Sequence, residues 1–275
     1  MSSRVPVKRS SGQARRGRTI RRASAGLSPL RAGAILIMLL SAAATYGVVA
    51  SSMFGYRQVA IDGHRFTPTS AVEDALALTS GTNLFALSTD RLAATLRALT
   101  TVRDATVSVE LPDTVRVRLA EREPVLVWAV GASRFLVDRE GVLFATLDSA
   151  PSAARGLQAV DDRRAGSVGL SIGARLDPVD VDAATRLGSL TPADVGSAAT
   201  GLTVAVDDEQ GFTVASAPAT WTATFGFYTP TLRTPELVPG QVRLLRSLMA
   251  RIGEGRLATI LLADTTDGTY TVHDQ

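Results

Sequence analysis

Residues 105–124 read ATVSVELPDTVRVRLAEREP, and they hold the clearest pattern in the chain. Apolar and polar side chains alternate up to Leu111, and the alternation resumes from Val115 to Leu119. A period of two is typical of a strand with one buried and one solvated face. Pro112-Asp113 favours a turn between the two halves. The stretch therefore predicts a β-hairpin.

Two helices and a short strand are expected before this hairpin. Ser70-Ala71-Val72-Glu73 has the pattern of a capping box, in which the serine and glutamate side chains bind free backbone N–H groups. A second helix should begin near Thr89-Asp90, because three leucines follow at helical spacing: Leu92, Leu96 and Leu99. With a strand over residues 59–63, the order predicts a three-stranded sheet covered on one side by two helices.

An apolar segment lies near the N-terminus. Residues 32–54 read AGAILIMLLSAAATYGVVASSMF, which is 23 residues without a charged side chain. As a helix this segment would extend about 34 Å, enough to cross a hydrocarbon core of about 30 Å. Nine bases and no acid precede it within residues 1–31. Since positive charge is retained inside, the N-terminus is expected in the cytoplasm and the bulk of the chain outside it.

The N-terminal region is open to three other interpretations. A basic tail can bind nucleic acid, but the apolar segment that follows explains the charge better. Val48-Val49-Ala50 resembles a signal-peptidase site, although the apolar run before it is longer than a usual signal peptide has. Arg21-Arg22 resembles a twin-arginine signal but lacks the apolar pair that should follow.

The residues available for chemistry are few. The chain has no cysteine and two histidines, which excludes disulfides and thiolate catalysis and leaves no usual zinc site. Neither a metal nor another cofactor is expected, nor is a small-molecule substrate. Gly169-Leu170-Ser171-Ile172-Gly173 matches a nucleophile elbow, to which Asp264 and His273 could add an acid and a base. An elbow needs a buried strand before the serine and a helix after it.

Residues 149–170 are rich in small and charged side chains and are interpreted as a loop, with Asp161-Asp162 solvated. The hydrolase reading is therefore disfavoured, and no catalytic residue is assigned. Beyond the first hairpin, the pattern predicts a mixed β domain with two helices. Its expected elements are a hairpin over 135–144, helices over 178–190 and 239–252, and strands over 202–206, 212–215, 221–225, 259–262 and 270–272.

Several short motifs, in this order after one membrane segment, resemble the polypeptide-transport-associated (POTRA) domain of the FtsQ/DivIB family of bacterial cell-division proteins. The motif residues are Val59, Ile61, Gly63, Gly81, Asn83, Leu84, Phe85, Pro112, Glu121, Arg122 and Pro124. Singly, each has an ordinary structural role: Leu84 and Phe85 would fill a core, and residues 121–123 would solvate a strand end.

The resemblance implies an α+β protein in four parts. These are a cytoplasmic basic tail (1–31), a transmembrane helix (32–54), a POTRA domain of β-α-α-β-β order (56–123) and a C-terminal β domain with two helices (124–275). It also implies a non-catalytic scaffold at the division septum. The implied partners are single-pass proteins of the FtsB/DivIC and FtsL types and, indirectly, the septal peptidoglycan synthases.

An exposed last strand can pair with a strand of a partner through its backbone. The candidate residues for this edge are Tyr270, Thr271 and Val272, with Ile260 and Leu262 on the neighbouring strand; alternatively, they only complete the sheet. A module that assists protein transport is the second functional reading, although such proteins usually carry several POTRA domains or a barrel.

Overall fold

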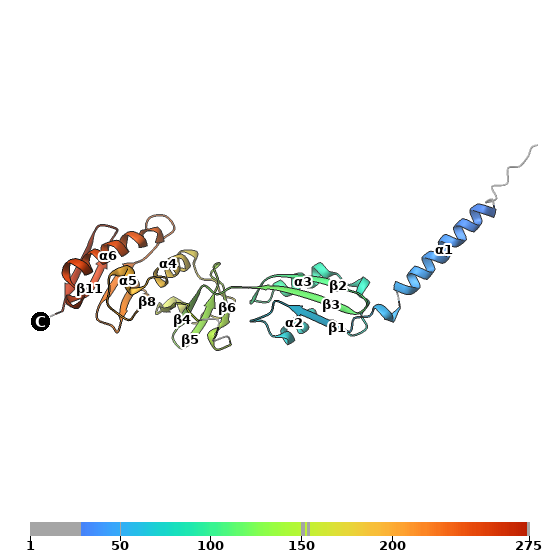
Figure 1. The fold of residues 1–275 in the computed structure, drawn as a ribbon, viewed down its shortest axis with the longest axis horizontal. Coiled ribbons are helices and arrows are strands. Elements are labelled where there is room, and N and C mark those ends of the chain that lie inside the picture. The colour runs from blue at the N-terminus through green and yellow to red at the C-terminus, as the bar shows by residue number, and fades with distance from the viewer. Residues whose placement is uncertain (1–28, 50, 150–151, 153–154, 274–275) are drawn as a thin grey trace, which may run out of the picture. The chain divides into compact units, whose positions relative to one another are not determined.

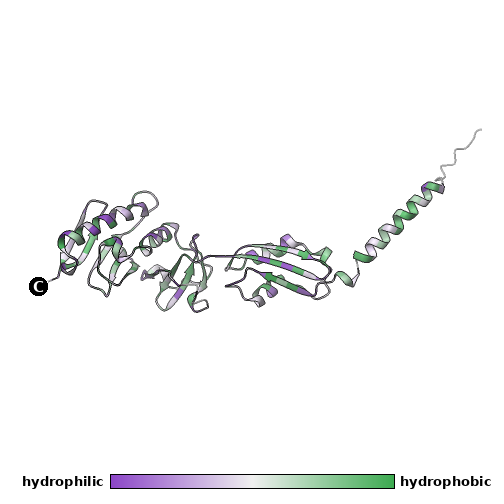
Figure 2. Ribbon diagram, in the orientation of Figure 1, coloured by the Kyte–Doolittle hydropathy of each residue, from purple (hydrophilic) through white to green (hydrophobic). Residues whose placement is uncertain are grey.

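The computed structural model describes residues 29–49, 51–149, 152 and 155–273. Its first element, α1 (Pro29–Val49), is a 21-residue helix that Figure 2 shows to be predominantly apolar. Within the described residues it is the one helix long and apolar enough to cross a membrane. The predicted bounds of 32–54 differ at both ends. The helix starts earlier because proline suits a first turn, and residues 52–54 form a separate 3₁₀ turn.

The first folded domain after α1 is a three-stranded sheet with two helices, and the predicted order of its elements is confirmed. The central strand β3 pairs in parallel with β1 and antiparallel with β2. Its elements, labelled in Figure 1, are β1 (Gln58–Asp62), α2 (Thr69–Leu76), α3 (Thr89–Arg97), β2 (Val102–Glu110) and β3 (Thr114–Glu121).

The alternation in the hairpin determines which face of this sheet is covered. Val107 and Val117 form a cross-strand pair, and both are buried. Opposite them, α2 contributes Val72 and α3 contributes Leu96, neither of which is exposed to solvent. The apolar face of the hairpin and the leucine face of α3 therefore make the core of this domain.

The predicted capping box is wrong. Helix α2 begins at Thr69, with Pro68 at its N-cap and no side-chain cap. Pro68 has an extended backbone (φ −61°, ψ 143°), so the chain enters the helix directly after it. Ser70 consequently lies inside the helix, past the position where a hydroxyl can cap.

Two motif residues have structural roles that the sequence did not indicate. Gly63 has φ +82°, and a Cβ there would lie 2.3 Å from the carbonyl oxygen of Leu119. Only glycine fits this turn. Glu121 does not merely solvate a strand end, because its carboxylate accepts from the backbone N–H groups of residues 65–67 at 2.7–2.8 Å. Both motif residues join the turn after β1 to the end of β3.

The second domain is built on a nine-stranded sheet in the order β12-β11-β10-β9-β8-β7-β4-β5-β6. The first strands along the chain are β4 (Leu126–Val130), β5 (Ser133–Val137), β6 (Leu143–Thr146) and β7 (Ala159–Asp162). Then follow α4 (Pro178–Gly188), α5 (Pro192–Val195), β8 (Gly201–Asp207), β9 (Gly211–Ala217), β10 (Thr222–Gly226), α6 (Val238–Ile252), β11 (Leu257–Leu262) and β12 (Gly268–Val272).

The interpretation of residues 149–170 as a loop is wrong at its centre. Strand β7 lies inside the sheet, parallel to both β4 and β8. Its Val160 is fully buried, and Asp162, expected to be solvated, is 2% exposed. A four-residue strand that ends in two acids has too little alternation to be recognised in the sequence.

Helices α4 and α6 pack on one face of the sheet and form its main core. The helix predicted over 239–252 is confirmed as α6, and its Leu245, Leu248 and Met249 are buried. At the β4–β6 end the opposite face also carries a small core, in which Phe144 meets Phe66 of the first domain. Their ring centroids lie 5.2 Å apart, so the two domains share apolar contacts.

Candidate functional site

Strand β12 is an outer strand of the nine-stranded sheet. It pairs antiparallel with β11, and no strand among the described residues pairs with its other side. Backbone N–H and C=O groups on such an edge can accept a further strand.

The opposite edge of this sheet is covered. Outside β6, the backbone N–H of Leu143 donates to Ala174 at 2.9 Å, and that of Gly173 donates to Leu143 at 2.8 Å. Next to them, Val142 and Arg175 form an antiparallel bridge. The chain thus protects β6 with residues 173–176 and leaves β12 open, so the two edges are not equivalent.

The side chains predicted for the binding edge fall into two groups. Tyr270 and Val272 are 43% and 44% exposed, and Thr271 between them is also exposed. Ile260 and Leu262 are 1% and 0% exposed and belong to the main core. The last two lie on the neighbouring strand β11, where they can support the edge but cannot offer side chains to a partner.

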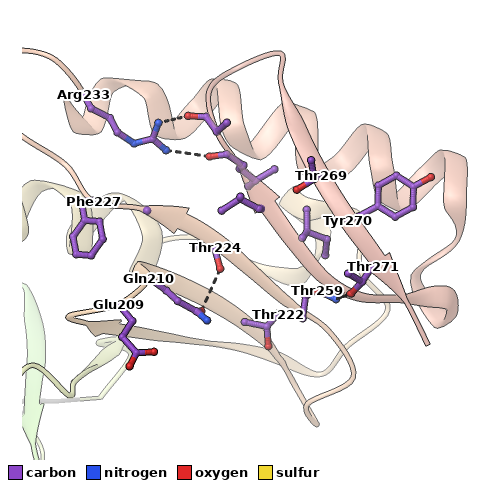
Figure 3. A pocket seen from close by; sticks show the side chains of 15 residues that line it. Glu209, Gln210, Thr222, Thr224, Phe227, Arg233, Thr259, Thr269, Tyr270 and Thr271 are labelled. Atoms are coloured by element: carbon purple, nitrogen blue, oxygen red, sulfur yellow. Dashed lines mark hydrogen bonds between the residues drawn. The ribbon is translucent and has the colours of Figure 1, made fainter. Parts of the chain in front are cut away.

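The face of the sheet away from α6 is hollowed beside this edge. A groove of about 740 Å³ lies across β10, β11 and β12. Figure 3 shows the side chains that line it, and the ring of Tyr270 points away from the groove. Leu261, half exposed, lies in this groove. Around it are hydroxyl groups from all three strands: Thr222, Thr224, Thr259, Thr269 and Thr271. This surface was not predicted from the sequence, although Leu261 alternates with the buried Ile260 and Leu262 along β11.

Two polar side chains fix the ends of the strands that support the edge. Gln241 donates to the carbonyls of Phe225 and Leu262 at 3.0 and 2.9 Å, and Arg233 donates to the same two carbonyls. These carbonyls stand at the ends of the parallel strands β10 and β11. Satisfying them holds both strands in register just before the chain turns into β12.

The hydroxyl of Tyr228 in turn donates to Gln241 at 2.8 Å. Burial raises the pKa of Tyr228, so its proton stays in place at neutral pH. The amide of Gln241 is thereby oriented with its nitrogen toward the two carbonyls. The edge is therefore presented by a fully hydrogen-bonded support.

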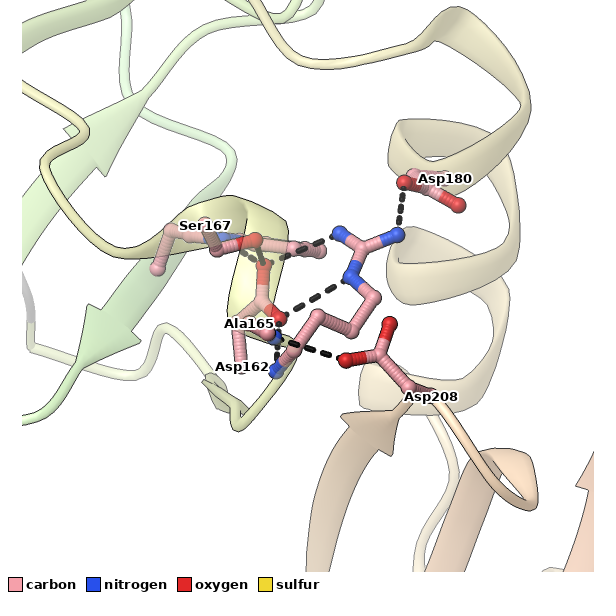
Figure 4. Close-up of polar contacts among 7 residues, drawn as sticks. Asp162, Ala165, Ser167, Asp180 and Asp208 are labelled. Carbon is pink, nitrogen blue, oxygen red and sulfur yellow. Dashed lines mark hydrogen bonds and ion pairs between the residues drawn. The ribbon is translucent and has the colours of Figure 1, made fainter.

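A second polar cluster surrounds Asp162 at the end of β7, as Figure 4 shows. Its carboxylate accepts from the indole of Trp128 at 3.0 Å, from the hydroxyl of Ser167 and from the guanidinium of Arg164. Arg164 also pairs with Asp180 at 2.6 Å. Each carboxylate oxygen of Asp162 accepts hydrogen bonds, so this cluster stabilises the end of β7 in the sheet.

The motif of a nucleophile elbow does not form an active site. Ser171 lies in an exposed segment without a strand before it or a helix directly after it. Asp264 accepts from the backbone of Thr266 and Asp267 in its own turn, and the ring of His273 contacts the carbonyl of Thr220. The structure does not join these side chains, and no group of three potential metal ligands occurs within the described residues.

The POTRA motif residues occupy several environments. Val59, Ile61 and Leu84 pack in the core, whereas Phe85 is 51% exposed, contrary to the expectation that it fills the core. Asn83 accepts from the backbone N–H of Phe85 at 2.9 Å and so caps the turn that presents this ring. The remaining motif residues lie in turns or at the domain junction: Gly81, Pro112, Arg122 and Pro124.

Comparison with known proteins agrees with this arrangement. Residues 54–122 match the family model described as POTRA domain, FtsQ-type. Over 127 residues the chain is 39% identical to the protein named Cell division protein FtsQ of Streptomyces bingchenggensis, covering 46% of this chain and 48% of that one.

The protein of the same name from Chloroflexus aurantiacus is 28% identical over 170 residues, which is 61% of each chain. The one from Rickettsia felis is 33% identical over 88 residues, or 32% of this chain and 33% of its own. The matches thus span a third to about three fifths of these relatives. Residues 54–122 form a POTRA domain of the FtsQ type, in a chain that is similar to proteins named cell division protein FtsQ.

Proposed function

We propose that this protein is a non-catalytic scaffold in bacterial cell division. Helix α1 anchors it in the cell membrane with the basic tail in the cytoplasm, and both folded domains act outside at the septum. The FtsQ-type POTRA domain and the similarity to cell division proteins FtsQ support the process. The hydrogen-bonded polar clusters described above favour binding over catalysis.

The single observation that carries the binding role is the open edge of β12, in a sheet whose other edge the chain itself covers. A partner strand added here would gain backbone hydrogen bonds, and its side chains on one face would meet Leu261 and the threonine hydroxyls of the groove. On the other face they would meet Tyr270. We assign this edge to a partner of the FtsB/DivIC type, with an FtsL-type protein in the same complex. The septal peptidoglycan synthases are then linked indirectly.

The edge can be tested by recovery of the FtsB-like partner on the full-length membrane protein. Thr271→Pro, which places a ring on the edge strand, and Tyr270→Ala, which removes an exposed aromatic, are expected to lower recovery at least about tenfold. Thr271→Ser keeps both the hydroxyl and the backbone N–H, and should retain the partner.

Thermal unfolding of each variant separates loss of binding from loss of fold. Partner recovery equal to that of the unchanged protein, in a folded Thr271→Pro variant, would reject the assignment of the edge.

A further inference from the structure

Four apolar side chains gather at one end of the POTRA domain without a covering element. Met53 is 64% exposed, Phe85 51% and Leu111 54%. The fourth is Phe54, which is partly exposed. They come from three separate segments: the 3₁₀ turn after α1, the loop before α3 and the turn between β2 and β3. We call this set the entry patch.

Backbone bonds hold the first two segments together. The N–H of Tyr56 donates to Thr82 at 2.8 Å, and the N–H of Gly81 returns a bond to Tyr56 at 2.8 Å. The rings of Phe54 and Phe85 meet edge to face with centroids 5.2 Å apart. The exposed ring of Phe85 is therefore fixed beside the chain that enters the domain.

The third segment is brought to the same end by the sheet. Strands β1 and β3 run in parallel and start in register, with Gln58 beside Thr114. The N–H of Arg57 donates to the carbonyl of Asp113 at 2.9 Å, which joins the entering chain to the turn that carries Leu111. Exposed apolar side chains brought to one end of a domain in this way favour an interaction site there.

The length of chain between the patch and the membrane helix indicates the occupant. Helix α1 ends at Val49, four residues before Met53, and four residues extend at most about 14 Å. The headgroup layer is itself roughly 5–7 Å deep on each side. A patch tethered this closely to a membrane span has lipid headgroups and the upper acyl chains within reach.

We propose that the entry patch rests in the lipid interface and seats the end of the POTRA domain on the bilayer. Aromatic rings and methionine are well suited to that layer, where burial of their apolar surface is favourable. The patch would thereby limit how far the domain swings about the chain after α1. This inference rests on the membrane anchor of the proposed function.

The absence of cysteine from the chain allows a direct test by single-site labelling. Met53→Cys and Leu111→Cys carry an environment-sensitive NBD fluorophore in the full-length protein, reconstituted into vesicles of phosphatidylcholine and phosphatidylglycerol. His64→Cys is the matched control, since it is exposed in the turn after the opposite end of β1. Leu111 is decisive, because it is far along the sequence from α1 and approaches lipid only if the domain end does.

We expect blue-shifted emission from the labels at residues 53 and 111, and quenching by lipids that carry a nitroxide near the headgroup, with neither effect at residue 64. A label at residue 111 that behaves like the one at residue 64 would overturn the proposal. Burial of the labels in native membranes but not in lipid vesicles would also overturn it, in favour of a protein occupant. Failure of the protein to float with vesicles would instead contradict the anchor.

Discussion

Asp162 shows how much the surroundings change the meaning of a residue. In the sequence it stands in Asp161-Asp162-Arg163-Arg164, a run typical of a solvated loop. In the structure its side chain is wholly buried and holds Trp128, Ser167 and Arg164 together. Its neighbour Asp161 stays at the surface with Arg163. Both acids belong to β7, but Asp162 lies on its buried face with Val160, whereas Asp161 lies on the other face.

Replacing Asp162 by Asn should therefore lower the free energy of unfolding by about 1–3 kcal/mol at neutral pH, since Arg164 and Ser167 lose their buried carboxylate partner while Asp180 still pairs with Arg164. Burial disfavours the charged form of Asp162, but the bonds from Arg164 and Ser167 outweigh this and hold its pKa below the usual range. A depressed carboxyl pKa stabilises the fold above the unfolded value of about 3.9, and this stability is lost as pH falls through the lower folded pKa.

The difference between Asp162→Asn and the unchanged protein should consequently shrink in acid. Asp180 acts in the opposite sense, because burial raises the pKa of its carboxyl despite the bond from Arg164. The charge of Asp162 is itself one of the causes that raise this pKa, so the two carboxylates titrate as a coupled pair through Arg164. Urea titrations in detergent at neutral and acidic pH, with Asp161→Asn as the control, measure the effect. An equal loss at both pH values would show that the charge of Asp162 is not the cause.

At the scale of elements, the sequence predicted those helices and strands in which apolar residues recur with a regular period. The hairpin of β2 and β3, helix α3 and helix α6 each repeat a pattern long enough to be recognised, and all were found where expected. The short parallel strand β7 was not, because its neighbours in the sheet are far away in sequence.

The candidate edge was predicted as a strand, but the sequence did not predict which of its two faces is buried. Alternation shows that Ile260 and Leu261 point to opposite sides of β11, and only the position of α6 decides which side is core. Arg233 and Gln241, which support the edge, come from a loop and a helix, and no local signal connects them with β10 and β11. Tertiary packing carries that information.

The junction between the two domains offers a prediction at the same scale. Directly after β3, Arg122 donates to the carbonyl of Thr100 at 3.1 Å and pairs with Asp138 and Glu140 of the second domain. Arg122→Met keeps the length of the side chain but leaves Asp138, which is 5% exposed, without its cation. We expect a loss of about 1–3 kcal/mol in the free energy of unfolding.

Hydrogen exchange of the intact protein should locate this loss. Faster exchange is expected in residues 121–125 and in the turn after β5, with little change in α6. The neighbouring exposed Arg139→Met is the control. Uniformly faster exchange in both domains, or none at the junction, would contradict a local coupling by Arg122.

At the scale of the whole molecule, charge and membrane topology belong together. Nine bases lie before the apolar segment, and the net charge of the entire chain is +3, so the remaining residues are net acidic. Arg and Lys residues beside a membrane span favour retention of that end in the cytoplasm. We therefore expect the two folded domains on the outer side of the cell membrane, where the β12 edge can meet a partner.

This topology predicts opposite accessibility for two single cysteines, introduced at Ser3 and Leu232 of the cysteine-free chain. Leu232 is 93% exposed in the second domain, so a cysteine there should react with a membrane-impermeant maleimide on intact spheroplasts. A cysteine at Ser3 should react only after the membrane is opened. Replacing the arginines of residues 1–31 by glutamine should give a mixture of both orientations, because the charge that retains the tail is then removed. Labelling of Ser3→Cys on intact spheroplasts would reverse the assigned orientation and would place the open β12 edge on the cytoplasmic side.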